Sequence, residues 1–230
     1  MDQLTLSPEL LLSIAQIVFI DILLGGDNAV VIALACRKLP PELRNKGIFW
    51  GLFGAIALRV LLIFFALQLL ALPFLKIIGS LLLFWIGIKL LATDDDDDDG
   101  HAAIVGRSHL LGAIRTVIVA DAVMSIDNVI AIAGAADGHI GLVAFGIVIS
   151  VPIIVWGSKL VLALMDRFPL VMVLGSALLG WVGGALWLGD AYLAPRLGHP
   201  PQWAHLGSAA IGAVLVVAIG KLLAQHRGGS

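Results

Sequence analysis

Charged residues are scarce in this sequence. Of its 230 residues only 13% are Asp, Glu, Lys or Arg, whereas 60% are hydrophobic. A soluble domain has about 25% charged residues, so a water-soluble globule of this size is excluded. At roughly 20 apolar residues for each crossing of a bilayer, the chain has room for six or seven membrane-spanning helices. We therefore expect an all-α polytopic membrane protein whose main partner is the lipid bilayer.

Cysteines and basic clusters are scarce as well. The single cysteine, Cys36, cannot form a disulfide within the chain and implies no redox framework. No patch of Lys and Arg is interleaved with aromatic residues, which argues against nucleic acid as a partner. No basic segment precedes the first apolar stretch, so we expect that stretch to remain as a first span and not to be a cleaved signal.

Prolines and polar clusters divide the apolar sequence into spans. Pro40 and Pro41 lie in a charged connector, because proline cannot continue a helix, while Pro73 and Pro169 suit the first turns of their spans. The acidic run Asp94–Asp99 is expected to be a solvated, disordered linker, since like charges repel. The seven predicted spans are residues 10–36, 47–71, 73–92, 109–135, 139–164, 169–189 and 205–225.

Lys and Arg fall mainly in alternate connections between these spans. The 37–46 connection contains four of them and five others fall on the same side, whereas the opposite connections contain little beyond Lys76 and Arg196. Because cytoplasmic loops are enriched in Lys and Arg, the N-terminus is predicted to lie outside and the C-terminus in the cytoplasm. The basic residues that carry this prediction are Arg37, Lys38, Arg44, Lys46, Arg107, Arg115, Arg167, Lys221 and Arg227.

Two segments 100 residues apart share an acidic motif. Both read D-x5-D-N, first at Asp21 with Asp27-Asn28 and again at Asp121 with Asp127-Asn128. Residues 73–94 and 169–190 also agree at nine of 22 positions without a gap, including Pro, Gly-Ser, Trp and the final Asp. These matches predict an internal duplication.

The duplicated unit contains three spans. Three is an odd number, so the second copy is expected to lie upside down relative to the first, as in many secondary transporters. The expected organisation is a first repeat at 1–92, an acidic cytoplasmic linker at 93–108, an inverted second repeat at 109–190, and an outer loop, seventh helix and tail at 191–230.

Four aspartates fall inside predicted spans, which is costly. Asp21, Asp27, Asp121 and Asp127 together would cost on the order of 10–14 kcal/mol if ionised and uncompensated. A compensating cation is therefore expected for much of the time. With the amide oxygens of Asn28 and Asn128 the set offers only oxygen ligands, which suit Mn²⁺, Mg²⁺ or Ca²⁺.

Two basic residues also lie deep in apolar sequence. Arg59 and Lys159 occupy the second spans of the two repeats, and we expect them to pair with the aspartates when no metal is bound, or to act in gating. For Lys159 an alternative is that its side chain reaches along the helix to the cytoplasmic edge. Gly79-Ser80 and Gly175-Ser176 are expected to serve close helix packing.

The spacing within the first motif suggests a distortion of the helix. On a straight helix Asp21 and Asn28 share a face, whereas Asp27 lies about 120° away. Gly25-Gly26 sits between the aspartates and would permit an unwound segment that brings all three side chains to one site.

With these motifs in view, the chain resembles the TerC family of integral membrane proteins, and more closely its YjbE-like branch. The segments IVFIDILLGGDNAVVIALACRKLP and IVADAVMSIDNVIAIAGAADG look like the two signature stretches of that family. The likeness covers essentially the whole chain. It implies kinship with LysE-type transporters, and a role like that of family members tied to manganese export, metal homeostasis and tellurite resistance.

The resemblance also implies a ligand set. Carried over by position, the acidic metal ligands of the family fall on Asp21, Asp27, Asp121 and Asp127, beside Asn28 and Asn128. The poly-Asp linker departs from the His- and Glu-containing loop expected of the family, which leaves a metal-sensing loop in doubt.

These observations lead to a functional hypothesis with two alternatives. The hypothesis is a bacterial inner-membrane Mn²⁺ exporter, not an enzyme and with no permanently bound cofactor, in which proton antiport drives the ion. The alternatives are a non-transporting metal-homeostasis or tellurite-resistance membrane partner, and an intramembrane aspartyl protease built on a shared-proton dyad. The duplication of the aspartate pair opposes the protease, which needs one dyad.

Overall fold

The computed structural model describes residues 27–65, 69, 72–92, 102–135, 140–198 and 200–227, with the side chains of 63–64, 102–108, 127–135, 140–148 and 227 left undescribed. Within these ranges every regular element is helical and no strand occurs. In chain order the elements are the helix Asp27–Cys36, α2 (Pro41–Phe64), α4 (Leu75–Ala92), α5 (Ala102–Ala135), α6 (Ile140–Arg167), α7 (Leu170–Leu186), the 3-10 turn η1 (Trp187–Gly189), α8 (Ala194–Leu197) and α9 (Gln202–Arg227).

Six of the described helices are long and apolar enough to cross a bilayer. They agree with six of the seven predicted spans, and the helix Asp27–Cys36 is the described part of the predicted first span. The all-α membrane architecture is thus confirmed. The part of the first span before Asp27 lies outside the described residues.

Two helices begin earlier than the sequence predicted. Helix α2 starts at Pro41, where residue 47 was expected, so residues 41–46 of the predicted charged connector are helical. Proline at the first helical position sacrifices no hydrogen bond, and the basic residues of the first turns remain at the protein surface. Helix α5 starts at Ala102, where residue 109 was expected, although its apolar window is only His109–Ile126. In both cases the helix extends beyond the apolar window that guided the prediction.

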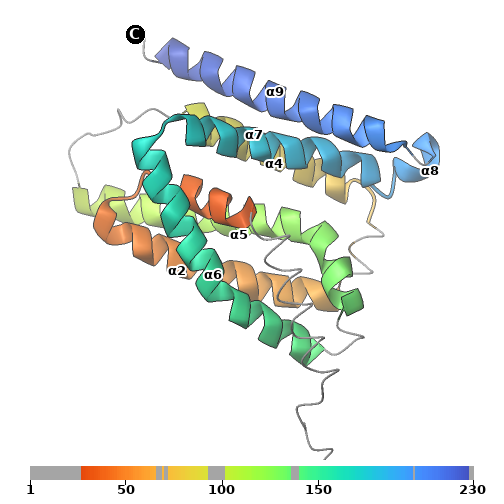
Figure 1. The fold of residues 1–230 in the computed structure, drawn as a ribbon, viewed down its shortest axis with the longest axis horizontal. Helices are drawn as coiled ribbons and strands as arrows, with labels where there is room; N and C mark the ends of the chain where they lie inside the picture. Colours follow the sequence, from red (N-terminus) through yellow and green to blue (C-terminus); the bar gives the residue numbers. More distant parts are fainter. Residues whose placement is uncertain are drawn as a thin grey trace, which may run out of the picture.

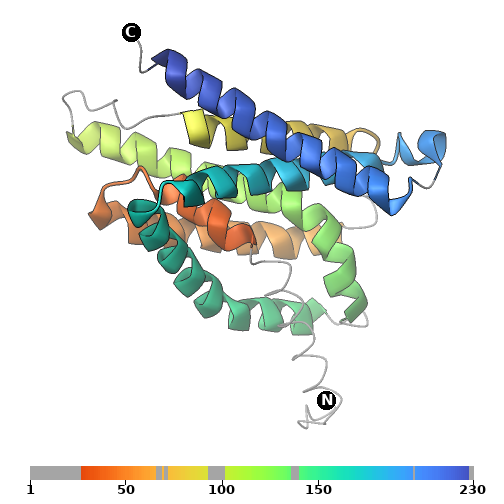
Figure 2. The same cartoon turned by 45° about the horizontal axis from the view of Figure 1, so that its top comes forward.

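The helices form two groups that pack face to face (Figure 1). Helices α4, α7 and α9 form one group, and α2, α5 and α6 form the other with the helix Asp27–Cys36. Contacts between α4 and α5 and between α6 and α7 join the groups. Helix α6 changes direction along its length (Figure 2), as expected from Pro152 within it, because proline removes a helical hydrogen bond.

The third spans of the two predicted repeats lie side by side and run in opposite directions (Figure 1). Ser80 of α4 donates its hydroxyl hydrogen to the Gly183 carbonyl of α7 at 2.6 Å. A Cβ on Gly183 would lie 3.1 Å from the Ser80 carbonyl oxygen. The close packing predicted for Gly79-Ser80 is therefore present, whereas the inverted second copy stays a prediction.

Helix α9, outside the predicted repeat, packs tightly on α7. A Cβ on Gly180 would approach the Gly212 carbonyl oxygen to 2.5 Å. The Ser208 hydroxyl donates to the Gly184 carbonyl at 2.6 Å. Small residues thus let the two backbones touch, which is how helices associate in lipid.

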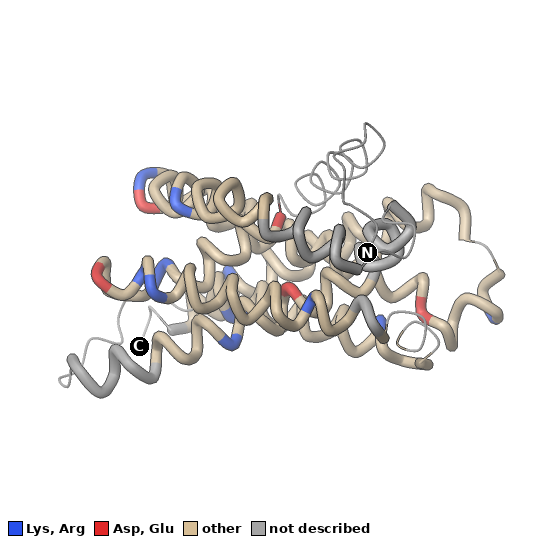
Figure 3. The backbone as a smooth tube through the Cα atoms, turned by 90° about the horizontal axis from the view of Figure 1, so that it is seen from below, with Lys and Arg blue, Asp and Glu red and all other residues tan. Residues whose placement is uncertain are grey.

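The predicted basic connections lie at one end of the molecule. The 37–40 connection, the α6–α7 connection and the end of α9 share this end (Figure 1), and Lys and Arg gather mainly toward it (Figure 3). Arg44 joins the 37–40 connection to the end of α6, because its guanidinium donates to Asp166 at 2.7 Å and to the Arg37 carbonyl at 3.0 Å. We call this the basic end.

Candidate functional site

A buried ion pair joins the two predicted repeats. Nη2 of Arg59 on α2 donates to Oδ1 of Asp121 on α5 at 2.5 Å. Nε of Arg59 donates to Oγ of Ser125 at 3.0 Å, and that hydroxyl donates to Asp121 Oδ2 at 3.2 Å. Arg59, Asp121 and Ser125 are 3%, 6% and 0% exposed, so a charged cluster is buried among apolar helices.

Helical spacing places this cluster. Asp121 and Ser125 are four residues apart and share one face of α5, and α2 packs against that helix. Gly51 and Gly54 bring α2 close, because a Cβ at either would contact Val117 or Ile118 within 3.1 Å. The pairing expected of Arg59 with a membrane aspartate is therefore present, whereas its role in gating stays a prediction.

Asp27 and Asn28 begin the described part of the first motif. Asp27 is partly exposed, and its Oδ1 accepts a hydrogen bond from the Asn28 backbone N–H at 2.9 Å. Asp27 and Met124, which lies between the two aspartates of the second motif, line one cavity. The described ends of the two motifs are therefore close together in the structure.

The Asn28 side chain is unusual. It is 3% exposed, and neither Oδ1 nor Nδ2 has a hydrogen-bond partner among the described residues. Most buried polar side-chain atoms are paired, and an unpaired group costs about 1–3 kcal/mol. An amide oxygen held in this way beside a carboxylate is available to a ligand.

Other predicted site residues are placed less favourably or lie outside the description. Asp21 is outside the described residues, as are the side chains of Asp127 and Asn128, whose backbone continues α5. Lys159 is exposed on α6, which agrees with the alternative of a side chain that reaches the membrane edge. Across the described residues no three His, Cys, Asp or Glu side chains gather to hold a metal ion.

A cavity of about 460 Å³ opens beside Asp27. Its other ionisable lining residues are Lys76 at the start of α4 and His205 near the start of α9. Met124, Trp181 and Ala185 supply apolar walls. Sequence reasoning missed these residues, because they come from segments far apart in the chain that the packing brings together.

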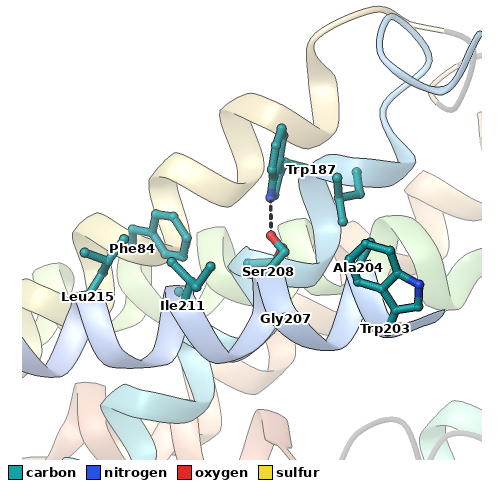
Figure 4. Close-up of a pocket in the computed structure, with 11 residues that line it drawn as sticks. Phe84, Trp187, Trp203, Ala204, Gly207, Ser208, Ile211 and Leu215 are labelled. Carbon is teal, nitrogen blue, oxygen red and sulfur yellow. Dashed lines mark hydrogen bonds between the residues drawn. The ribbon is translucent and has the colours of Figure 1, made fainter. Parts of the chain in front are cut away.

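A second cavity, of about 500 Å³, is apolar and lies beside α9 (Figure 4). Phe84, Trp187 and Leu215 line it, and Trp187 Nε1 donates to Ser208 Oγ at 2.7 Å. None of its lining residues is ionisable, so it is not a candidate ion site.

Asp190 has a structural role at the other end of the molecule. It is fully buried, and its carboxylate accepts hydrogen bonds from the backbone N–H groups of Phe74, Lys76, Ile77 and Tyr192 at 2.9–3.4 Å. Burial raises the pKa of this carboxyl, but the four hydrogen bonds outweigh it and hold the pKa below its usual value. The last residue of the second repeat thus caps the first turn of α4.

The fold and the buried charges define the class: a multi-pass α-helical integral membrane protein with ionised groups enclosed between its helices. Comparison with known proteins gives the family. The integral membrane protein TerC family matches residues 6–228, and the chain belongs to this family.

Several curated relatives are membrane proteins. The chain is 44% identical to the Bacillus subtilis membrane protein YjbE over 81% of this chain and 84% of the relative. It is 26% identical to B. subtilis YceF over 68% and 63% of the two chains. It is also 26% identical to the Escherichia coli inner membrane protein YgdQ over 78% and 81%. No solved structure matches.

Proposed function

We propose that this protein is a divalent cation transporter that exports Mn²⁺ across the bacterial inner membrane. The ion would bind between the two copies of the D-x5-D-N motif. Asp27, Asn28 and Asp121 are the described members of this site, and Asp21, Asp127 and Asn128 complete the proposed ligand set.

The observation that carries the proposal is the unpaired Asn28 amide beside Asp27. A purely structural asparagine would find partners, because its burial is otherwise unfavourable. A cation bound between the Asp27 carboxylate and Asn28 Oδ1 would satisfy that oxygen. Carboxylate and amide oxygens are ligands that hard divalent cations prefer.

Arg59 supports the proposal as an internal counter-ion. An Asp121 carboxylate in an apolar core needs a positive charge, and Arg59 supplies it in the absence of metal. A divalent cation next to Asp121 would repel the guanidinium and take over its role. Metal binding would then be coupled to movement of α2 relative to α5, which belong to different repeats.

Manganese is proposed over Mg²⁺ and Ca²⁺ on the family resemblance, because the ligand types suit all three. Proton antiport is proposed because closely spaced carboxylates bind protons when the metal leaves. Rocking of one repeat against the inverted other would carry the ion outward, with the basic end facing the cytoplasm.

The alternatives fit less well. A protease dyad needs two carboxylates that share one proton, whereas Asp121 is paired with Arg59 and Ser125. A non-transporting metal-homeostasis partner would bind the ion without moving it, which flux measurements distinguish.

The test is Mn²⁺ flux into proteoliposomes for the wild type, Asp27→Asn and the matched control Asp166→Asn. Asp166 is likewise an aspartate on a helix, but it lies exposed at the basic end and pairs with Arg44. We expect flux in the wild type and in the control, and at least a tenfold loss in Asp27→Asn. Equal flux in all three proteins would exclude Asp27 from the pathway. Folded, metal-binding protein without flux would favour the non-transporting partner.

A further inference from the structure

We propose that the cavity beside Asp27 is a water-filled vestibule, open toward the end opposite the basic end and closed toward the basic end. Among the described residues, cations and water would reach Asp27 from that side. The identity of the cation rests on the proposed function, whereas the one-sided access to Asp27 does not.

The lining of the cavity indicates water in place of lipid. Three ionisable side chains from three elements line it, namely Asp27, Lys76 and His205. Lipid chains offer no hydrogen bonds to the Asp27 carboxylate or the His205 ring, and leaving these two groups unsolvated would cost several kcal/mol. Ionisable residues at membrane depth usually face a water-filled cavity.

The helix ends that line the cavity indicate toward which end of the molecule it opens. Lys76 is the second residue of α4, Gly189 ends η1 after α7, and His205 is the fourth residue of α9. These three helix ends lie together, away from the basic end (Figures 1 and 2). By the enrichment of Lys and Arg in cytoplasmic loops, this side is the outside.

The opposite side of Asp27 is tightly packed. From Asp27 the helix Asp27–Cys36 runs toward the basic end (Figure 1). Its residues Ile32 and Cys36 are buried in a cluster with Leu39, Ile48 and Val117, each 2% exposed or less. A Cβ on Gly47 would lie 2.6 Å from Leu39 Cδ1 and 3.0 Å from Cys36 Sγ, so not even a methyl group fits without displacement.

The two sides together describe one state of an alternating-access cycle. Asp27 faces the outer vestibule, while the cluster around Cys36 forms the closed inner gate. Access from the cytoplasm would require this cluster to open, which would expose the one cysteine of the chain.

Thiol labelling tests the access directly. Ala185→Cys places a thiol in the wall of the vestibule, and Ile78→Cys places one near the same end of the bundle on the exposed apolar surface of α4. The wild type carries only the buried Cys36. The reagent is a membrane-impermeant cationic methanethiosulfonate, applied to right-side-out and inside-out membrane vesicles.

We expect at least tenfold faster labelling of Ala185→Cys than of Ile78→Cys or the wild type, and only from the outside. Slow labelling of Ala185→Cys, or labelling from the cytoplasmic side alone, would overturn the vestibule. Both variants must elute from gel filtration like the wild type.

A second variant separates this inference from the proposed function. Met124→Cys places a thiol on α5 in the part of the vestibule that reaches the core cluster. Labelling that Mn²⁺ slows would support both the vestibule and metal binding at Asp27. Labelling unaffected by Mn²⁺ would keep the vestibule and contradict the metal site. No labelling of Met124→Cys or Ala185→Cys would remove the vestibule whatever the flux.

Discussion

A guanidinium and a carboxylate enclosed among apolar helices stabilise each other only as a pair. Arg59 and Asp121 satisfy this condition, with Ser125 bonded to both. Removing one partner of a buried pair leaves an uncompensated charge, which costs far more than the pair itself contributes. Replacing either Arg59 or Asp121 alone by a neutral residue should therefore destabilise the protein.

Arg59→Met should lower the free energy of unfolding by about 3–5 kcal/mol, because Asp121 is left buried without its counter-ion. The double variant Arg59→Met, Asp121→Asn should recover most of that loss. Denaturant unfolding in detergent measures both effects. The control is Arg44→Met, which breaks an exposed pair with Asp166 and should cost about 1 kcal/mol or less. A double variant as unstable as Arg59→Met would contradict this account of the cluster.

The sequence predicted the charged residues and the pairing of Arg59 with a membrane aspartate, but not the other side chains around them. Asp27, Asp121 and Arg59 stand out because charge is rare in apolar spans. Ser125 was missed as a partner, although its spacing of four residues from Asp121 was a usable signal. Lys76 and His205 gave no such signal, since their approach to Asp27 depends on how α4 and α9 pack.

Among the elements, α4 depends on a residue from the far end of the second repeat. Asp190 accepts hydrogen bonds from three N–H groups around its first turn. The preceding Phe74 has φ of 67°, which is uncommon for a side chain of this size. Its ring lies 4.4 Å from the ring of Tyr192, so Asp190 and Tyr192 together hold a strained turn in place.

Asp190→Asn should lower stability by about 2 kcal/mol at pH 7, because hydrogen bonds to a charged acceptor are lost or weakened. The wild-type contribution also depends on pH. The pKa of this carboxyl is lower in the folded than in the unfolded state, so its stabilisation is complete above the unfolded value near 3.9 and is lost as the pH falls through the folded value.

Unfolding measured between pH 7 and pH 3 tests this prediction. The difference between wild type and Asp190→Asn should be constant from pH 7 to about pH 5 and should shrink in more acidic solution. A difference that does not change with pH would contradict the role of the ionised carboxylate.

Helix boundaries were predicted where apolar runs end, and that rule has a physical limit. Helix α5 begins at Ala102, ahead of its apolar window His109–Ile126, because a helix needs backbone hydrogen bonds and not a bilayer around it. The small residues at Gly180, Gly184 and Gly212 gave no boundary signal at all. Their effect appears only in how closely α7 and α9 approach.

For the whole molecule, the membrane class, six of the spans and the antiparallel course of the third spans could be predicted from composition and the repeat. The cavity on one side of Asp27 and the tight packing on the other side could not be predicted from the sequence. They depend on how α4, α7 and α9 contact one another, which no local sequence pattern encodes.

The charged cluster is related to the proposed motion of the whole protein. Arg59 and Asp121 belong to different predicted repeats, and the proposed vestibule and closed gate lie on opposite sides of Asp27. A cation that displaces Arg59 would weaken a contact between the repeats at the moment the site is filled. Binding of the cation would thereby be coupled to the change in the side of the membrane from which the site is reached.

Binding of Mn²⁺ to the purified protein tests whether a divalent cation is held by Asp27 and by the Asn28 amide, which has no hydrogen-bond partner among the described residues. The paramagnetic resonance signal of free Mn²⁺ reports binding without any need for transport. The comparison uses the wild type, Asp27→Asn, Asn28→Leu and the surface control Asp166→Asn. We predict saturable binding to the wild type and control, and at least tenfold weaker binding to the other two. Equal Mn²⁺ affinity in all four proteins, or none in the wild type, would contradict the account.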